Sequence, residues 1–406
     1  MNKLNPYLPI ILIDTSYWLY YRFFALRNWY SRAYPELYIS NTNNFNYNWF
    51  EDELFMCKYK KLFVDNIKKI CKQYKTKLEN VILCFDCPHN EIWRHNKVKL
   101  ENKIIHIKNK IIQKKIEKEK PNDVNIDDVN IDDVNIDDAN IDNDIISEEM
   151  INNCKENSII ENIKPYKGTR LESHKKNKFN SFNIFDYMKY KFIPTIKDNN
   201  NNNIKIINCS KCEADDIIGH LSLYIDNHMK TRANEYNTYN QHKIYILAND
   251  NDYLQVCNNN IKLINGLGNI ISGNKGENYY GDKYLISKIL LGDKSDNIRN
   301  CTIDSGYLHN GIPNNKFKNV TKKCLESIFD NTEKYTFLNT LLNDIRTNIN
   351  NIELDNSNIS IYSNNKITTC KYIDINTFIH NCNMMDFQML PEKLKDNLYS
   401  IFTEII

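Results

Sequence analysis

Three acidic residues of this chain each follow a short apolar run, a placement that suits metal or phosphate chemistry. Asp14 closes "IILID", Asp86 closes "VILCFD" and Asp250 closes "KIYILAND". Continuous apolar runs rich in β-branched residues are typical of strands buried on both faces of a parallel sheet. Because ligands bind at the carboxyl edge of such sheets, we expect these three carboxylates to lie together there.

Six further acids lie in two other motifs and beside Asp250. The motif "CEADDIIGHL" (Cys212–Leu221) reads as the first turn of a helix, where carboxylates meet the positive end of the helix dipole. The motif "LLGDKSDNI" (Leu290–Ile298) holds Asp293 and Asp296 at the i, i+3 spacing that places both on one side of a helical turn. The complete set of candidate metal-ligating residues is Asp14, Asp86, Glu213, Asp215, Asp216, Asp250, Asp252, Asp293 and Asp296.

So many carboxylates in one place need counter-ions. At ~4 Å each pair repels by about 1 kcal/mol in water, and by about 4 kcal/mol at an effective dielectric constant near 20. Mg²⁺ or Mn²⁺ removes this repulsion and suits carboxylate ligands better than zinc does. Two such ions ~3.5–4 Å apart are typical of in-line phosphodiester cleavage. Any single acid could instead be a helix cap or a solvated loop residue, but the ordered set favours the metal site.

The apolar runs alternate with helical patterns such as Leu62–Tyr74, which predicts an α/β fold. We expect a mostly parallel central sheet with helices on both faces. From Leu290 onward the chain is mostly helical in pattern and predicts a second, smaller domain. The expected organisation is a catalytic domain at 1–95 and 166–290, an inserted segment at 96–165 and a helical C-terminal domain at 291–406.

The inserted segment differs in composition from the rest of the chain. Lys97–Lys120 holds nine Lys against three Glu, whereas Asp123–Glu149 holds eleven acids and no Lys or Arg. The acidic part repeats "VNIDD", whose five-residue period suits neither helix nor strand, so we expect disorder there. Two interpretations of the basic part stay open, a surface for nucleic-acid phosphates and a solvated helix face.

Composition limits the location and the partners of the protein. A net charge of +2 over 406 residues means that affinity for nucleic acid must come from local basic patches. No stretch reaches the ~18 apolar residues of a membrane helix, and the first ten residues lack the marks of a signal peptide. We therefore expect an intracellular protein with no membrane contact, and no obligate protein partner is evident.

The twelve cysteines then read as reduced thiols or metal ligands before disulfides. The pairs "CFDC" (Cys84, Cys87) and "CSKC" (Cys209, Cys212) offer a four-thiolate zinc site as an alternative metal centre. Cys84 lies inside a predicted strand, however, where residues three apart face opposite sides. Buried thiols on apolar strands are the favoured interpretation.

Taken in order, the motifs resemble those of a known nuclease family. The series is "LIDTSYWLYYRFFA", "CFDCPHNEIWRH", "YKGTR", "EADDIIG", "ANDNDYLQV" and "LLGDKSDNI". It is similar to the 5′-nucleases of the flap endonuclease type, which include the 5′→3′ exonuclease domain of bacterial DNA polymerase I and phage 5′-exonucleases. The resemblance covers Ile10–Arg94 and Tyr166–Ile298. It implies a PIN-like, resolvase-like catalytic domain and a C-terminal domain of the helix-hairpin-helix type.

The resemblance also implies roles for the acidic residues. A first Mg²⁺ or Mn²⁺ ion would be surrounded by Asp14, Asp86, Glu213, Asp215 and Asp250. A second ion would be held by Asp252, Asp293 and Asp296, and Asp216 would join either ion through water.

Basic residues match those of the family's helical arch, which receives a single-stranded 5′ end. The matches are Arg94, Lys167 and Arg170. Lys167 and Arg170 would contact the scissile phosphate and stabilise its developing charge. Tyr166 would offer a face for base stacking.

The chain departs from the family pattern at three places. Thr15 stands where the family has Gly, and the arch carries the long insertion. After Ile298, the family's hairpin that grips duplex DNA, often with a K⁺ ion, is recognisable only as a stretched remnant that includes Lys316 and Lys318.

The sequence thus predicts a metal-dependent 5′→3′ exonuclease or flap endonuclease that hydrolyses DNA from a free 5′ end or at a 5′ flap, in replication or repair. A catalytically lapsed, nuclease-derived nucleic-acid-binding protein is the alternative. A haloacid-dehalogenase-like phosphatase with Asp14 as nucleophile is disfavoured, because Ser16 stands where its general acid is needed.

Overall fold

The computed structural model describes residues 3–36, 48–95, 182–198, 204–236, 243–271, 280–304, 320, 322–347, 359–361, 371–373 and 375–405. The predictions for the inserted segment 96–165 lie outside these residues, as do those for Tyr166, Lys167, Arg170, Lys316 and Lys318. All of them stay predictions.

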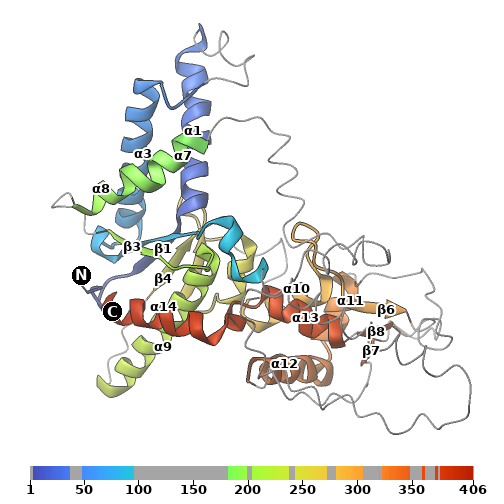
Figure 1. Ribbon diagram of the computed structural model, residues 1–406. Helices are drawn as coiled ribbons and strands as arrows, with labels where there is room; N and C mark the ends of the chain where they lie inside the picture. The colour runs from blue at the N-terminus through green and yellow to red at the C-terminus, as the bar shows by residue number, and fades with distance from the viewer. Residues whose placement is uncertain are drawn as a thin grey trace, which may run out of the picture.

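A five-stranded parallel sheet forms the centre of the molecule, in the order β3-β2-β1-β4-β5 (Figure 1). Its strands are β1 (Ile10–Asp14), β2 (Val81–Phe85), β3 (Lys205–Asn208), β4 (Ile244–Leu247) and β5 (Ile261–Ile264). β1 lies in the middle, with Ile13 opposite Leu83 of β2 and Leu247 of β4. The predicted parallel sheet is confirmed, and the structure adds the edge strands β3 and β5.

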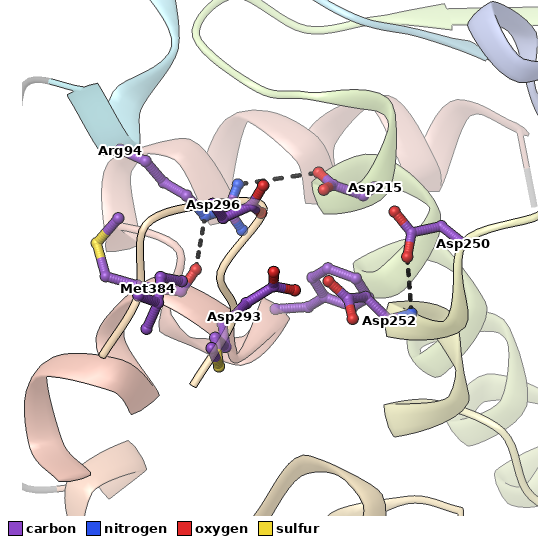
Figure 2. A pocket seen from close by; sticks show the side chains of 10 residues that line it. Arg94, Asp215, Asp250, Asp252, Asp293, Asp296 and Met384 are labelled. Atoms are coloured by element: carbon purple, nitrogen blue, oxygen red, sulfur yellow. Dashed lines mark hydrogen bonds and ion pairs between the residues drawn. The ribbon is translucent and has the colours of Figure 1, made fainter. Parts of the chain in front are cut away.

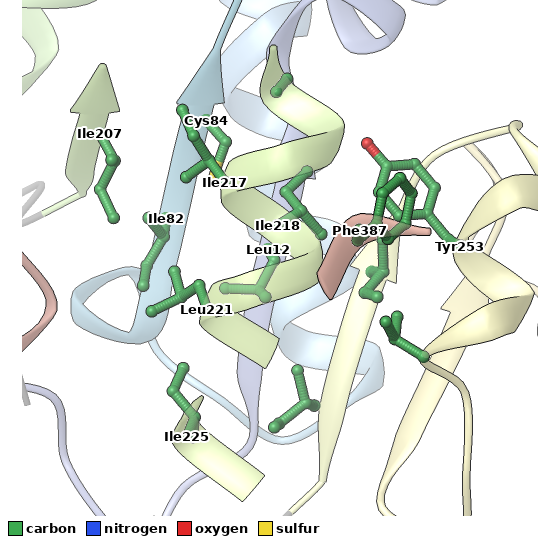
Figure 3. Packing of buried hydrophobic residues seen from close by; sticks show 14 of the residues in the cluster. Leu12, Ile82, Cys84, Ile207, Ile217, Ile218, Leu221, Ile225, Tyr253 and Phe387 are labelled. Carbon is green, nitrogen blue, oxygen red and sulfur yellow. The ribbon is translucent and has the colours of Figure 1, made fainter. Parts of the chain in front are cut away.

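Helices cover both faces of the sheet, as predicted. One face packs against α1 (Thr15–Ala33), α3 (Glu53–Gln73), α7 (Phe182–Tyr187) and α8 (Ile193–Asp198), and the other against α9 (Ala214–Tyr236) and α14 (Glu392–Ile405). Because successive strand residues point to opposite faces, Ile11 and Ile13 enter the first core and Ile10 and Leu12 the second. Figure 3 shows Leu12 and its strand neighbours meeting the apolar stripe of α9.

A third hydrophobic cluster lies in the C-terminal half of the chain. It is built mainly by α10 (Asp282–Leu291), α11 (Lys322–Phe329), α12 (Thr332–Thr347) and α13 (Ile375–Met385). The mostly helical character is therefore confirmed. An antiparallel sheet in the order β6-β8-β7 was not expected; its strands are β6 (Thr302–Asp304), β7 (Ile359–Ile361) and β8 (Lys371–Ile373).

The end of the chain returns to the central sheet. Leu398 and Phe402 of α14 are fully buried in the cluster that α9 forms with the sheet. Phe387, in the short helix η7 (Phe387–Met389), packs so closely on α9 that a Cβ at Gly219 would come within 2.5 Å of its ring. Phe387, Leu390 and the buried face of α14 thus share the core of the central sheet. The predicted domain boundaries stay predictions.

Short helical turns complete the described elements: η1 (Leu78–Asn80), η2 (His89–Glu91), η4 (Met188–Phe192) and η5 (Asn251–Gln255). No helix in the part of the chain that the structure describes is long and apolar enough to cross a membrane.

Candidate metal centre

Two of the strand-end acids cap the helical element that follows them. Asp14 ends β1, and its Oδ1 accepts a hydrogen bond from the Tyr17 amide of α1 at 2.9 Å. Asp250 follows β4, and its Oδ1 accepts from the Asp252 amide of η5 at 2.9 Å. Strand and cap together fix each carboxylate at the carboxyl edge of the sheet, where the sequence predicted it.

Asp86, just past β2, joins two helices at the same edge. One carboxylate oxygen accepts from the Ser16 hydroxyl at the start of α1. The other accepts from the Ala214 amide, the first of α9, at 2.8 Å. The carboxylate therefore uses the unpaired amide that a helix N-terminus offers, and it ties the acids of β1 to those of α9.

Negative charge accumulates at this edge. Burial, followed by the charges of Asp86 and Asp250, raises the pKa of Asp14 to about 7. The buried Tyr253 hydroxyl donates to Asp14 Oδ2 at 3.4 Å. Burial and then the charges of Asp14, Asp215, Asp250 and Asp86 raise the pKa of this tyrosine. The charges of four carboxylates thus act on the hydroxyl of one buried tyrosine.

The first turn of α9 holds a tighter acidic group. Ligand atoms of Glu213, Asp215 and Asp216 lie within 4.8 Å of one another. Arg94 faces them, with Nη1 at 3.1 Å from Glu213 Oε2 and 3.8 Å from Asp215 Oδ1, and Nη2 at 2.7 Å from Asp216 Oδ1. Only 2% of the arginine is exposed. Its Nε donates to the Met384 carbonyl at 3.1 Å, so the guanidinium is held between the α9 acids and this backbone group.

Asp216 serves the fold of this turn. Its carboxylate is fully buried and accepts from Trp93 Nε1 at 3.0 Å and from the Glu213 amide at 3.0 Å, in addition to Arg94. This set of donors leaves Asp216 anchored to protein groups. Arg94, which the sequence matched to the arch of the 5′-nucleases, lies here as the buried counter-ion of the α9 acids.

A second half of the centre is organised by Lys288, a residue that the sequence analysis did not single out. Its Nζ lies 2.8 Å from Asp252 Oδ1 and 2.7 Å from Asp293 Oδ2. Burial acts to lower the pKa of Lys288, but the charges of Asp252 and Tyr284, together with the hydrogen bonds to Asp252 and Asp293, raise the pKa above its ordinary value. Burial would raise the pKa of Asp293, yet hydrogen bonds from Lys288 and Ser295 lower it to about 2. The signal in the sequence was a lysine in the last turn of a helix, five residues before Asp293.

The loop that carries Asp293 and Asp296 differs from the expected helical turn. Asp293 and Ile298 pair with each other through both amides, at 3.0 and 2.7 Å, and close a tight turn. Gly292 enters it at φ 68°, where a Cβ would meet the Arg299 backbone at 2.4 Å. Glycine is therefore required at this position, and the closed turn rather than a helix sets the direction of the two acids.

The floor of the centre comes from the far end of the sequence. Gln255 of η5 donates to the Met385 carbonyl at 3.1 Å and accepts from the Phe387 amide at 3.0 Å. Together with the bond from Arg94 to Met384, this anchors the acidic loops to residues 384–387. Sequence reasoning missed this segment, because backbone groups that act as partners leave no signature in side-chain type.

Five acids from three parts of the chain surround one pocket above this floor (Figure 2): Asp215, Asp250, Asp252, Asp293 and Asp296. Asp296 is 8% exposed, whereas Asp250 is open to solvent. Asp14 and Asp86 lie at the same edge of the sheet, where the charges of Asp86 and Asp250 act on Asp14. The structure therefore brings the predicted acids to one edge of the sheet, five of them around the pocket.

The donor set fits a hard divalent cation, because every candidate ligand is a carboxylate oxygen. The four-thiolate alternative is not formed. Cys84, Cys87, Cys209 and Cys212 are buried free thiols, and within the described ranges only the α9 acids gather three or more potential ligand atoms within 4.8 Å.

Comparison with known proteins adds distant structural similarity. No family model and no curated protein matches the chain. The solved structures that resemble it include T5 D15 protein co-crystallised with metal ions, at 10% identity and a TM-score of 0.43 over 98% of both chains. T5 5′-exonuclease with bound zinc matches at 12% identity and 0.43, over 98% of this chain and 99% of that one. A complex of bacteriophage T5 D15 flap endonuclease with DNA and metal ions matches at 11% and 0.45, over 98% of both.

The chain is similar to phage T5 5′-nucleases. The exonuclease and the flap endonuclease among these structures are the kind of protein that the sequence motifs resemble. At this identity and TM-score, the chemistry of the centre is inferred from its own residues.

We expect Arg94→Met to lower the free energy of unfolding by about 3–5 kcal/mol, because it leaves the buried carboxylates of Glu213 and Asp216 without their counter-ion. Urea denaturation in EDTA measures this change without a contribution from bound metal. Arg94→Lys keeps the charge but not the planar fork and should recover only part of the loss. The control is Arg32→Met at an exposed site in the last turn of α1, which should change stability by less than about 0.5 kcal/mol. Equal stability of Arg94→Met and the wild type would contradict the counter-ion role.

Proposed function

We propose that this protein is a divalent-metal-dependent nuclease that hydrolyses DNA phosphodiesters as a 5′→3′ exonuclease and 5′-flap endonuclease. The observation that carries the proposal is the pocket lined by Asp215, Asp250, Asp252, Asp293 and Asp296. Asp14 and Asp86 add further negative charge at the same edge of the sheet, where Asp86 and Asp250 raise the pKa of Asp14. A hydrolase that relies on a Ser, Cys or His nucleophile would not need so many acids.

The residues present suit two ions. Asp14, Asp86, Glu213, Asp215 and Asp250 would hold the first, and Asp252, Asp293 and Asp296 the second. Mg²⁺ or Mn²⁺ bound there would polarise the scissile phosphate and lower the pKa of an attacking water. The chain's own groups orient the ligands: amides at the starts of α1, α9 and η5 hold Asp14, Asp86 and Asp250.

Lys288 supports the placement of the second ion. Its ammonium lies within hydrogen-bond distance of both Asp252 and Asp293, between two carboxylates that would otherwise repel each other. A protein cation at this point marks a position that favours positive charge. A divalent ion that takes up the same carboxylates would have to displace the ammonium or share them with it.

The choice of substrate rests on the motifs rather than on the pocket. In the resemblance to 5′-nucleases, Lys167 and Arg170 clamp the scissile phosphate and Tyr166 stacks on a base. Lys316 and Lys318 would belong to the grip on duplex DNA, with K⁺ as its cation. A role in DNA replication or repair follows from that substrate class.

In one respect, Lys288 favours the alternative function of binding nucleic acid without cleaving it. Because Lys288 already satisfies Asp252 and Asp293, the chain has a stable arrangement without a second ion. A nuclease-derived protein that binds nucleic acid without cutting it could keep such a lysine.

Cleavage of a 5′-labelled flap substrate separates the two functions. The purified full-length protein should release label with Mg²⁺ and not with EDTA. Asp250→Asn and Asp293→Asn should each lower the rate by more than about 100-fold, the upper end of the effect of outer-shell partners of a metal. Asp344→Asn, on the exposed side of α12, is the matched control and should cleave at the wild-type rate. Flap binding without metal-dependent release would support the alternative function, and wild-type rates with either site variant would reject the metal assignment.

A second prediction concerns Lys288 itself. Lys288→Met should lower the free energy of unfolding in EDTA by about 1–3 kcal/mol, because it leaves two partly buried carboxylates unpaired. Added Mn²⁺ should restore more stability to the variant than it adds to the wild type, since the ion no longer competes with the ammonium. Thermal unfolding over a Mn²⁺ series measures both effects. An equal increase in stability with Mn²⁺ in the two proteins would show that the Lys288 ammonium and the ion do not compete for the same carboxylates.

A further inference from the structure

The helix that precedes β3 contains an irregular turn. Met188–Phe192 (η4) is a π-helical turn between α7 and α8, and such turns are rare and frequent at functional sites. The turn is firmly placed, because Met188 and the flanking Ile184 and Ile193 are buried in the core on one face of the sheet. The irregularity therefore belongs to a packed element.

Lys189 of this turn contacts the backbone of a candidate metal ligand. Its Nζ donates to the Asp86 carbonyl at 2.8 Å. On its way the side chain passes the rings of Phe85 and Tyr190, with Nζ 5.6 and 5.2 Å from their centroids. The pairing of β2 with β3 ends at Phe85 and Asn208, so this carbonyl lies beyond the register of the sheet.

The peptide group after Asp86 is held from both sides. Lys189 binds its carbonyl, and its amide, that of Cys87, donates to the Cys212 carbonyl at 3.0 Å. The Asp86 carboxylate is fixed separately, by Ser16 and Ala214. Without Lys189, this peptide keeps its bond on the amide side only, so the Asp86 backbone is held less firmly and the carboxylate depends on Ser16 and Ala214 alone for its direction.

We propose that Lys189 is a positioning residue of the metal centre, which locks the Asp86 peptide so that its carboxylate stays directed at the first ion. This proposal rests on the proposed function. It also gives the π-helical turn a role, because the turn carries Lys189. Through Lys189, this helical segment before β3 contacts the acidic edge of the sheet at the Asp86 carbonyl.

Two effects of removing Lys189 have opposite signs and can be told apart. Loss of a positive charge near the acids alone would strengthen the binding of a cation. Loss of the lock on Asp86 would weaken it, as mutation of groups that orient metal ligands does by about 10–100-fold. The direction of the change in metal affinity therefore decides between charge and positioning.

The test is Mn²⁺ binding to the full-length protein by calorimetry, with the Mg²⁺ dependence of flap cleavage as a second readout. Lys189→Met should weaken Mn²⁺ binding by at least about 10-fold and raise the Mg²⁺ concentration for half-maximal cleavage by a similar factor. Its cleavage rate at saturating Mg²⁺ and its thermal midpoint in EDTA should stay near the wild-type values. Lys189→Arg retains a donor of similar reach and should recover most of the affinity.

The matched control is Lys191→Met, an exposed lysine on the same turn, which should leave Mn²⁺ binding unchanged. Unchanged or tighter Mn²⁺ binding by Lys189→Met, with wild-type binding and cleavage intact, would overturn the positioning role alone. A wild-type protein that binds no Mn²⁺ would overturn the proposed function and the role of Lys189 with it.

Discussion

Repulsion among carboxylates at the carboxyl edge of the central sheet is the constraint on which the rest of this structure depends. The parallel register of β1, β2 and β4 brings Asp14, Asp86 and Asp250 to one edge. The protein offsets part of that charge with two cations: the buried Arg94 faces the acids of α9, and the partly buried Lys288 bridges Asp252 and Asp293. Burial, together with the remaining charges of Asp86 and Asp250, raises the pKa of Asp14 to about 7.

Holding these groups against their repulsion requires several layers of support. Backbone amides at the starts of helices donate hydrogen bonds to these carboxylates, because their N–H groups are otherwise unpaired and favour negative charge. A tight turn with Gly292 at a positive φ directs Asp293, and backbone groups of residues 384–387 bind Arg94 and Gln255 from below. The centre is therefore assembled from both ends of the chain, and α14, which follows residues 384–387, packs beside α9.

Much of this arrangement was predictable because its causes are local. Apolar runs that end in an acid identified β1, β2 and β4, and the acidic first turn identified α9. β3 and β5 were missed because neither leads into an acid, the feature that identified β1, β2 and β4, and because each lies at an edge of the sheet. The three-residue strands of the second sheet carry even less pattern. Such elements exist through pairing with distant segments, and a single sequence does not record that pairing.

The same distinction applies to the centre. The acids were found by type and position, but the place of Arg94 was not, because its burial depends on the Met384 carbonyl 290 positions away. In the sequence, Lys288 has only the pattern of a lysine in the last turn of a helix. Its role depends on the packing of α10 against η5, which places it beside Asp252. Asp216 was grouped with the ligands by sequence. In the structure Trp93 and Arg94 bind its carboxylate, which also lies within 4.8 Å of ligand atoms of Glu213 and Asp215.

The most direct test of the metal centre is anomalous diffraction from crystals of the full-length protein grown with Mn²⁺. The account predicts two manganese peaks about 3.5–4 Å apart. One should lie among Asp14, Asp86, Glu213, Asp215 and Asp250. The other should lie beside Asp252, Asp293 and Asp296, with the Lys288 ammonium moved from its place. Crystals that show no manganese at this sheet edge, with Lys288 still bridging the two aspartates, would contradict it.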